Sequence, residues 1–191
     1  MKLTDSIYIK LRDEIFNAHY KPNDLITERQ IAEKYGVSKL TAGEVLHRLC
    51  SEGHLTSYPR SGYMVTLLTP REVAQLKKIR LSIEMLALEG VVQEASGEEI
   101  RSLRNYISDD FAEGANANEL NTAFHLKLAE LSKNRFLLSI LRDILGSLSR
   151  VEQHIPQELL KSWQEPHRRI VDALAERNLP QAVEALKEDL L

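Results

Sequence analysis

Three cations stand where they could contact the base edges and phosphates of a DNA duplex. Lys39 lies at the start of a short helical pattern, Arg29 lies in the pattern before it, and Arg60 occupies a turn beyond it. A helix that enters the major groove end-on presents its first residues to guanine edges or to phosphates. The residues of this segment predicted to face the groove are Ser38, Lys39, Thr41, Ala42 and Gly43.

Two helices joined by a tight turn would position these residues. Thr27 and Gln30 have the spacing of a capping box, so one helix is predicted to begin there, and Gly36 supplies the left-handed residue that ends it. Ser38 caps the next helix, which Gly53 closes. The buried stripe predicted for this second helix is Leu40, Val45, Leu46, Leu49 and Cys50.

A short hairpin is predicted to follow the second helix. Residues 55–58 and 63–66 alternate in polarity like strands, and the turn Pro59-Arg60-Ser61-Gly62 separates them. A turn with Arg60 and Gly62 suits a contact with a phosphate or with the minor groove. Together, the two helices and the hairpin predict a winged helix-turn-helix that binds double-stranded DNA.

Several motifs of this segment are shared with a known family. They are Glu28-Arg29-x-Ile31-Ala32, Gly36-Val37-Ser38, Glu44-x-Leu46-x-Arg48-Leu49, and Glu52-Gly53-x-Leu55 with Gly62. The stretch from Ile7 to Val65 thus resembles the N-terminal domain of GntR-superfamily transcription regulators. That family usually has Arg where this chain has Lys39 and Gly43. Because Lys lacks the bidentate fork of Arg, we expect an unusual operator or a modest affinity.

Composition and charge exclude several classes of protein. The chain has 191 residues and a net charge of −3, divided as +1 through residue 68 and −4 beyond it. The acidic part is not expected to touch DNA, and the nearly neutral first part favours dimerisation. With Cys50 as the single cysteine, a disulfide framework is excluded. The charged start and the lack of a long apolar run predict a cytoplasmic protein with no membrane partner.

The second part of the chain is predicted to be entirely helical. Thr69-Pro70-Arg71-Glu72 is a capping box with Pro at the first helical position, so we divide the chain into residues 1–68 and 69–191. Amphipathic helices are predicted over 70–94, 97–113, 117–131, 135–154, 157–176 and 180–190. The predicted fold class is therefore mostly α, a winged helix-turn-helix followed by an all-α antiparallel bundle of about six helices.

This second part also carries motifs of a known domain. They are Arg80-x-x-x-Glu84, Phe124-His125 with Asn134, His167, and Ala182-x-x-Ala185. The part resembles the FCD ligand-binding domain of the FadR branch of the GntR superfamily, in its shorter, VanR-type form. The resemblance implies a dimerisation domain that also binds a small organic-acid or sugar-acid effector.

The same resemblance implies a metal site. Many such domains place an Asp and a His four apart on one helix and a His on each of two later helices. The matching residues are Asn121, His125, His167 and Asp189, so both end ligands have changed. Two imidazoles and one carboxylate can hold zinc, nickel, manganese or iron. The alternative is a polar hole in which these groups bind water or an effector.

The candidate for clamping an effector carboxylate is Arg80, beside His125 and His167. A guanidinium recognises a carboxylate with two parallel hydrogen bonds. The alternative role for Arg80 is a salt bridge to Glu84, one helical turn away.

We therefore expect a homodimeric, ligand-responsive transcription regulator acting as a repressor. Its two winged domains would read half-sites about 34 Å apart, and the effector would change their separation or angle. An enzyme is not expected, because no nucleophile or acid–base pair has recognisable spacing. Two alternatives remain: a metal-dependent enzyme using His125 and His167, and a relic regulator that acts as an interaction module, which Gly43 keeps open.

Overall fold

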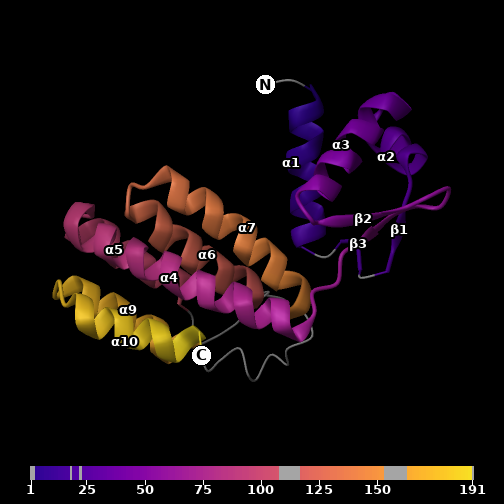
Figure 1. The fold of residues 1–191 in the computed structure, drawn as a ribbon. Helices are drawn as coiled ribbons and strands as arrows, with labels where there is room; N and C mark the ends of the chain where they lie inside the picture. The colour runs from indigo at the N-terminus through magenta and orange to yellow at the C-terminus, as the bar shows by residue number, and fades with distance from the viewer. Residues whose placement is uncertain (1–2, 18, 22, 108–116, 153–162, 191) are drawn as a thin grey trace. The chain divides into compact units, whose positions relative to one another are not determined.

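The computed structural model describes residues 3–190 except 18, 22, 108–116 and 153–162. The chain is mostly helical, with one small sheet in its N-terminal part (Figure 1). It forms two compact units, centred on residues 3–69 and 70–190. Within the described ranges, no helix is long and apolar enough to cross a membrane.

The first unit contains three helices and three strands. They are α1 (Leu3–Phe16), β1 (Leu25–Ile26), α2 (Glu28–Tyr35), α3 (Lys39–Ser51), β2 (Leu55–Tyr58) and β3 (Gly62–Val65). The predicted helix starts are confirmed, because Thr27 and Gln30 form a reciprocal capping box and the Ser38 hydroxyl accepts a hydrogen bond from the Thr41 N–H. Gly36 ends α2 in the left-handed conformation, with φ +65°.

The strands form an antiparallel sheet in the order β1-β3-β2. The hairpin of β2 and β3 was predicted, whereas β1 was not, because two residues are too short to show an alternating pattern. Gly62 allows β1 to pair closely with β3. Its φ is +136°, and a Cβ there would lie 2.6 Å from the carbonyl oxygen of Ile26. This is the reason that the wing requires glycine at residue 62.

The core of the first unit is built on one face of α3. Ala42, Val45, Leu46 and Leu49 are fully buried, at the i, i+3, i+4, i+7 spacing of a buried helical face. The prediction that Leu40 belongs to this face is wrong, because its side chain is 76% exposed. At roughly 100° per residue, Leu40 lies on the opposite side of the helix from Ala42.

The second unit is a bundle of helices. Its elements are α4 (Pro70–Glu94), α5 (Gly97–Ser102), the 3-10 helix η1 (Leu103–Tyr106), α6 (Ala117–Leu131), α7 (Arg135–Glu152), α9 (Gln164–Ala175) and α10 (Leu179–Leu190). Each of the six predicted helical segments therefore contains an α-helix in the described part of the chain. The segment predicted over 97–113 changes to a 3-10 helix after Ser102. Its residues 108–113, and the predicted helical residues 153, 154 and 157–162, lie outside the described residues.

The long helix α4 organises the bundle. It packs against α6 and α10, and α10 packs against α9 (Figure 1). The buried centre of this packing includes Leu88 and Val91 of α4, Phe124 of α6, Ile170 of α9 and Leu186 of α10. Arg177, in the turn before α10, donates hydrogen bonds to the carbonyl oxygens of Val91, Val92 and Ala95. These bonds tie the turn before α10 to the C-terminal end of α4, where the last carbonyl groups of a helix lack partners in a following turn.

A close contact lies at Gly90, near the C-terminal end of α4. A Cβ at this position would lie 2.8 Å from the Cβ of Ser132 and 3.0 Å from its carbonyl oxygen. Ser132 is itself held in the turn between α6 and α7, since its hydroxyl donates to the carbonyl oxygen of Ala129. The backbone of this turn can approach α4 because residue 90 has no side chain.

We predict that Gly90→Ala destabilises the bundle. Alanine favours a helix over glycine by about 1 kcal/mol, but overpacking against Ser132 should outweigh this gain and lower the free energy of unfolding by about 1–3 kcal/mol. Urea unfolding followed by the fluorescence of Trp163, the single tryptophan, measures the change. Gly97→Ala is the matched control, because its Cβ would meet only the end of the Arg101 side chain at 3.4 Å. A more stable Gly90→Ala variant would contradict the packing argument.

Candidate functional site

A hollow of about 450 Å³ lies in the first unit between α3 and the wing. The predicted cations Arg29, Lys39 and Arg60 all line it. The other residues around it include Glu28, His47, Tyr58 and Tyr63. The structure therefore brings to one concave surface three cations that are separated by up to 31 positions in the sequence.

The three cations differ in their surroundings. Arg29 donates a hydrogen bond to the Glu33 carboxylate at 2.8 Å, on an exposed surface of α2. Lys39 and Arg60 have no ion-pair or hydrogen-bonding partner among the described residues, so both are available to a ligand. Arg60 also has a left-handed backbone, with φ +64°, in the turn closed by the Ser61 N–H and the Tyr58 carbonyl oxygen. This conformation places it at the tip of the wing.

Two predicted groove-facing residues are corrected by the structure. Ala42 and Gly43 are buried, because both lie on the part of α3 that packs inside the unit. A Cβ at Gly43 would lie 3.2 Å from a carboxylate oxygen of Glu28, so this glycine faces α2. Ser38 is exposed and Thr41 is half-buried. Their hydroxyl groups form a hydrogen bond of 3.0 Å with one another.

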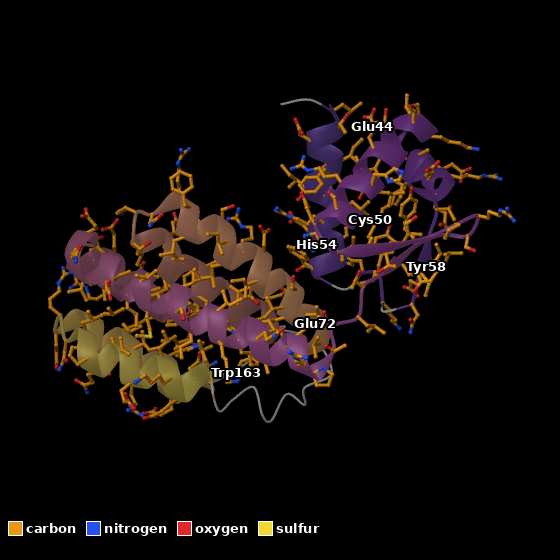
Figure 2. The ribbon with its side chains drawn as sticks, viewed as in Figure 1. Glu44, Cys50, His54, Tyr58, Glu72 and Trp163 are labelled. Atoms are coloured by element: carbon orange, nitrogen blue, oxygen red, sulfur yellow. The ribbon has the colours of Figure 1, made fainter. Side chains whose placement is uncertain are left out.

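The outward face of α3 contains residues that the sequence reasoning missed. Leu40, Glu44 and His47 are all exposed, and they recur at i, i+4 and i+7. Figure 2 shows Glu44 on α3, and Tyr58 at the end of the first wing strand. The phase of the helix could have revealed this face, because these positions lie opposite the buried Ala42, Val45 and Leu46.

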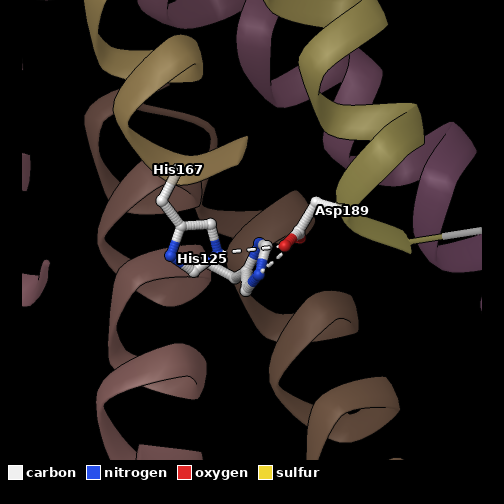
Figure 3. A group of neighbouring side chains, drawn as sticks. All are labelled: His125, His167 and Asp189. Atoms are coloured by element: carbon white, nitrogen blue, oxygen red, sulfur yellow. Dashed lines mark ion pairs between the residues drawn. The ribbon is translucent and has the colours of Figure 1, made fainter. Parts of the chain in front are cut away.

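A second candidate site lies in the bundle, where three helices meet. His125 of α6, His167 of α9 and Asp189 of α10 converge there (Figure 3). The two Nε2 atoms lie 3.2 and 3.3 Å from the Asp189 oxygens, and one ligand atom from each residue lies within 4.8 Å of the others. These contacts do not have hydrogen-bond geometry. Donor atoms that converge without bonding to one another suit a cation between them.

Glu84 of α4 adds a second layer to this cluster. One of its oxygens lies 2.6 Å from Nδ1 of His125, and the other accepts a hydrogen bond of 2.7 Å from Nε of Arg80. Glu84 and His125 are fully buried. A carboxylate on Nδ1 leaves Nε2 of the same ring facing Asp189, and this arrangement is typical of metal-binding histidines. Sequence reasoning placed Glu84 only in a salt bridge with Arg80, because its partner on α6 is 41 residues away.

Burial and charge oppose each other in this cluster. Burial alone would raise the pKa of Glu84, but His125 and Arg80 outweigh it and hold the pKa below its ordinary value. Burial alone would lower the pKa of His125, but Glu84 outweighs it and the pKa lies above its ordinary value. For His167, burial prevails over Asp189, and the pKa is lowered. Burial thus favours the neutral form of His167, which is the form that binds metal ions.

Other polar atoms of the bundle lack a partner. The side-chain oxygen of Asn121, one turn before His125 on α6, is buried without a hydrogen bond. Nη2 of Arg80 is also buried without a hydrogen bond, although Nε of the same side chain donates to Glu84. Phe124 stacks on the His167 ring at 3.9 Å and fixes its plane. The unpartnered amide and guanidinium atoms are places where a ligand could bind, because buried polar groups are normally satisfied.

The two units match two known families. Residues 3–65 match the family described as "Bacterial regulatory proteins, gntR family", and residues 75–191 match the family described as "FCD domain". The chain belongs to the GntR family. It is therefore a DNA-binding transcription regulator with an FCD effector-binding domain.

Individual relatives agree with this assignment. "Uncharacterized HTH-type transcriptional regulator YdhC" of Bacillus subtilis (strain 168) is 31% identical over 96% of this chain and 84% of its own length. "Nta operon transcriptional regulator" of Aminobacter aminovorans is 30% identical over 83% of this chain and 77% of its own. The solved structure "E. coli McbR/YncC" has a TM-score of 0.83 at 17% identity, over 100% of this chain and 94% of that chain, and shares the fold. Both of these sequence relatives are named as transcriptional regulators.

We predict that Lys39→Ala weakens binding to the selected operator by about 1–3 kcal/mol and relaxes sequence preference. Arg60→Ala should weaken binding to all sequences alike and reduce the salt dependence, because a phosphate contact carries no sequence information. Fluorescence anisotropy titrations on operator and scrambled duplexes at several salt concentrations measure both effects. Lys10→Ala, an exposed cation of α1 outside the hollow, is the control. An unchanged operator preference in Lys39→Ala would show that the reading surface lies elsewhere.

Proposed function

We propose that this regulator binds a first-row divalent metal ion and a small carboxylate effector in its bundle, and reads its operator as a homodimer. The first 68 residues would read DNA, and residues 69–191 would bind the effector and form the dimer. The observation that supports this proposal most directly is the convergence of His125, His167 and Asp189. A chromosomal operator would place its action in the cytoplasm.

The residues of the cluster fit a metal ion such as zinc, nickel or manganese. His125 and His167 would each contribute Nε2, Asp189 a carboxylate oxygen, and Asn121 a neutral amide oxygen. Asn121 should contribute least, because an amide oxygen is a poor ligand for transition metals and adds no charge. The ion would supply a Lewis-acidic centre to which an effector carboxylate can bind. Glu84 would hold the His125 ring in its ligating orientation.

The charges of the cluster favour an anionic effector. Arg80 and Glu84 form a buried ion pair and balance each other. A bound divalent ion would hold both imidazoles in the neutral form, so that Asp189 would contribute one negative charge and the total would be positive. Nη2 of Arg80 would donate a hydrogen bond to a carboxylate, since that atom is buried and unpartnered. A small organic acid or sugar acid has a carboxylate that could bind the metal ion and accept the hydrogen bond from Arg80.

Exposed apolar side chains on the bundle support a dimer. They are Ile79 and Leu86 of α4, and Phe136 and Ile140 of α7. We propose that a second copy of the chain covers them. Two reading surfaces related by a two-fold axis would then engage half-sites about 34 Å apart, and effector binding would change their spacing.

We predict that the wild-type protein binds a divalent metal and that His125→Ala and His167→Ala abolish the binding. Asp189→Asn, which keeps the side-chain volume, should remove most of the affinity, and Glu84→Gln should weaken it by about 10–100-fold. Asn121→Asp should tighten binding, because it adds a charged ligand. Metal analysis and calorimetry measure each effect.

His19→Ala is the control for these variants, since His19 is an exposed histidine outside the bundle. Circular dichroism in chelator establishes that each variant is folded. Equal metal content in the wild type, Asp189→Asn and His167→Ala would refute the metal site. Organic-acid binding that survives in all of them would instead support a purely polar cavity.

We predict a dimer in light scattering at micromolar concentration. Leu86→Glu combined with Phe136→Glu should give a monomer, because charges on a buried apolar interface are costly, and should weaken DNA binding. Leu67→Glu, at an exposed leucine before the bundle, should leave the dimer intact. A wild-type monomer with unchanged DNA affinity would contradict the proposal.

A further inference from the structure

The most exposed large apolar side chain in the described part of the chain belongs to the helix assigned to DNA reading. Leu40 is 76% exposed, more than Phe136 or any other large apolar side chain described. It is the second residue of α3, directly after Lys39 and two residues after the cap residue Ser38. An apolar side chain there does not contribute to the core, since the buried face of α3 lies on the other side.

The neighbours of Leu40 place it on the surface that would meet a base edge. Lys39 lines the hollow between α3 and the wing, and Glu44 and His47 continue the outward face of the helix. The first turn of a recognition helix is the part that comes closest to the bases. An exposed leucine in that turn is therefore positioned for a contact inside the groove.

The major groove offers one apolar group to such a side chain. The C5-methyl group of thymine is the feature of a base edge that an apolar residue recognises, and guanine, cytosine and adenine carry no methyl group there. Leu40 has no polar atom in its side chain and can discriminate only by apolar contact. Lys39 beside it can select guanine or bind phosphate, so the two residues would read different features.

We propose that Leu40 is a specificity-determining residue that contacts the methyl group of one thymine in each operator half-site. The proposal rests on the reading of DNA by α3. It assigns to this chain a requirement for thymine that arises from a hydrophobic contact and not from hydrogen bonding.

The test removes the methyl group and the side chain in turn. An operator is first selected from a random duplex library with the full-length wild-type protein. Each thymine is then replaced by deoxyuridine, which keeps every hydrogen-bonding group but lacks the C5-methyl. The wild type should lose affinity about three- to tenfold at one position of each half-site. Leu40→Ala should bind the thymine operator about three- to tenfold more weakly and be insensitive to deoxyuridine at that position.

Two further variants sharpen the test. Leu40→Met keeps an apolar tip and should remain sensitive to deoxyuridine, whereas Leu25→Ala, at an exposed leucine of β1, should behave as the wild type. Both Leu40 variants replace an exposed helical residue with a good helix former, so they should fold.

Three results would overturn the inference. If the selected operator contains no methyl-sensitive thymine, or if Leu40→Ala keeps the full sensitivity to deoxyuridine, Leu40 does not read thymine, although α3 still reads DNA. If Lys39→Ala and Leu40→Ala both leave operator binding unchanged, the assignment of α3 as the reading helix fails as well.

Discussion

The buried carboxylate of Glu84 is the interaction on which the bundle site depends. A charge without contact with solvent is strongly destabilising unless it is paired and hydrogen-bonded. Arg80 pairs with one oxygen of Glu84, and Nδ1 of His125 lies against the other. These two contacts join α4 to α6 and turn Nε2 of His125 toward Asp189 on α10. The orientation of the candidate metal ligands thus follows from neutralising one buried charge.

Packing around this charge keeps the helices in place. Phe124 stacks on His167, and Arg177 ties the turn before α10 to the end of α4. The close approach at Gly90 brings the turn after α6 to α4. Because such contacts are short and specific, small changes at the site can be transmitted to whole helices. Effector binding at Arg80 would act on the same helices.

The candidate DNA-binding surface of the first unit depends instead on helix caps and on a left-handed glycine. The caps at Thr27 and Ser38 and the left-handed Gly36 fix where α2 and α3 begin and end. Since caps act within a few residues, the sequence predicted these boundaries and the hairpin closely. The sequence also predicted that Val45, Leu46 and Leu49 are buried, and the structure confirms this. The prediction was wrong for Leu40, which is apolar but lies on the opposite side of the helix.

The sequence by itself determined the fold class and the order of the two parts, and it named His125, His167 and Asp189 as candidate metal ligands. Its capping boxes and amphipathic periods are local, and they are readable without any tertiary contact. Only the tertiary structure decided that His125, His167 and Asp189 converge, that Glu84 joins them, and that Gly43 is buried against Glu28. These contacts join residues from different helices, and no local pattern encodes how those helices pack.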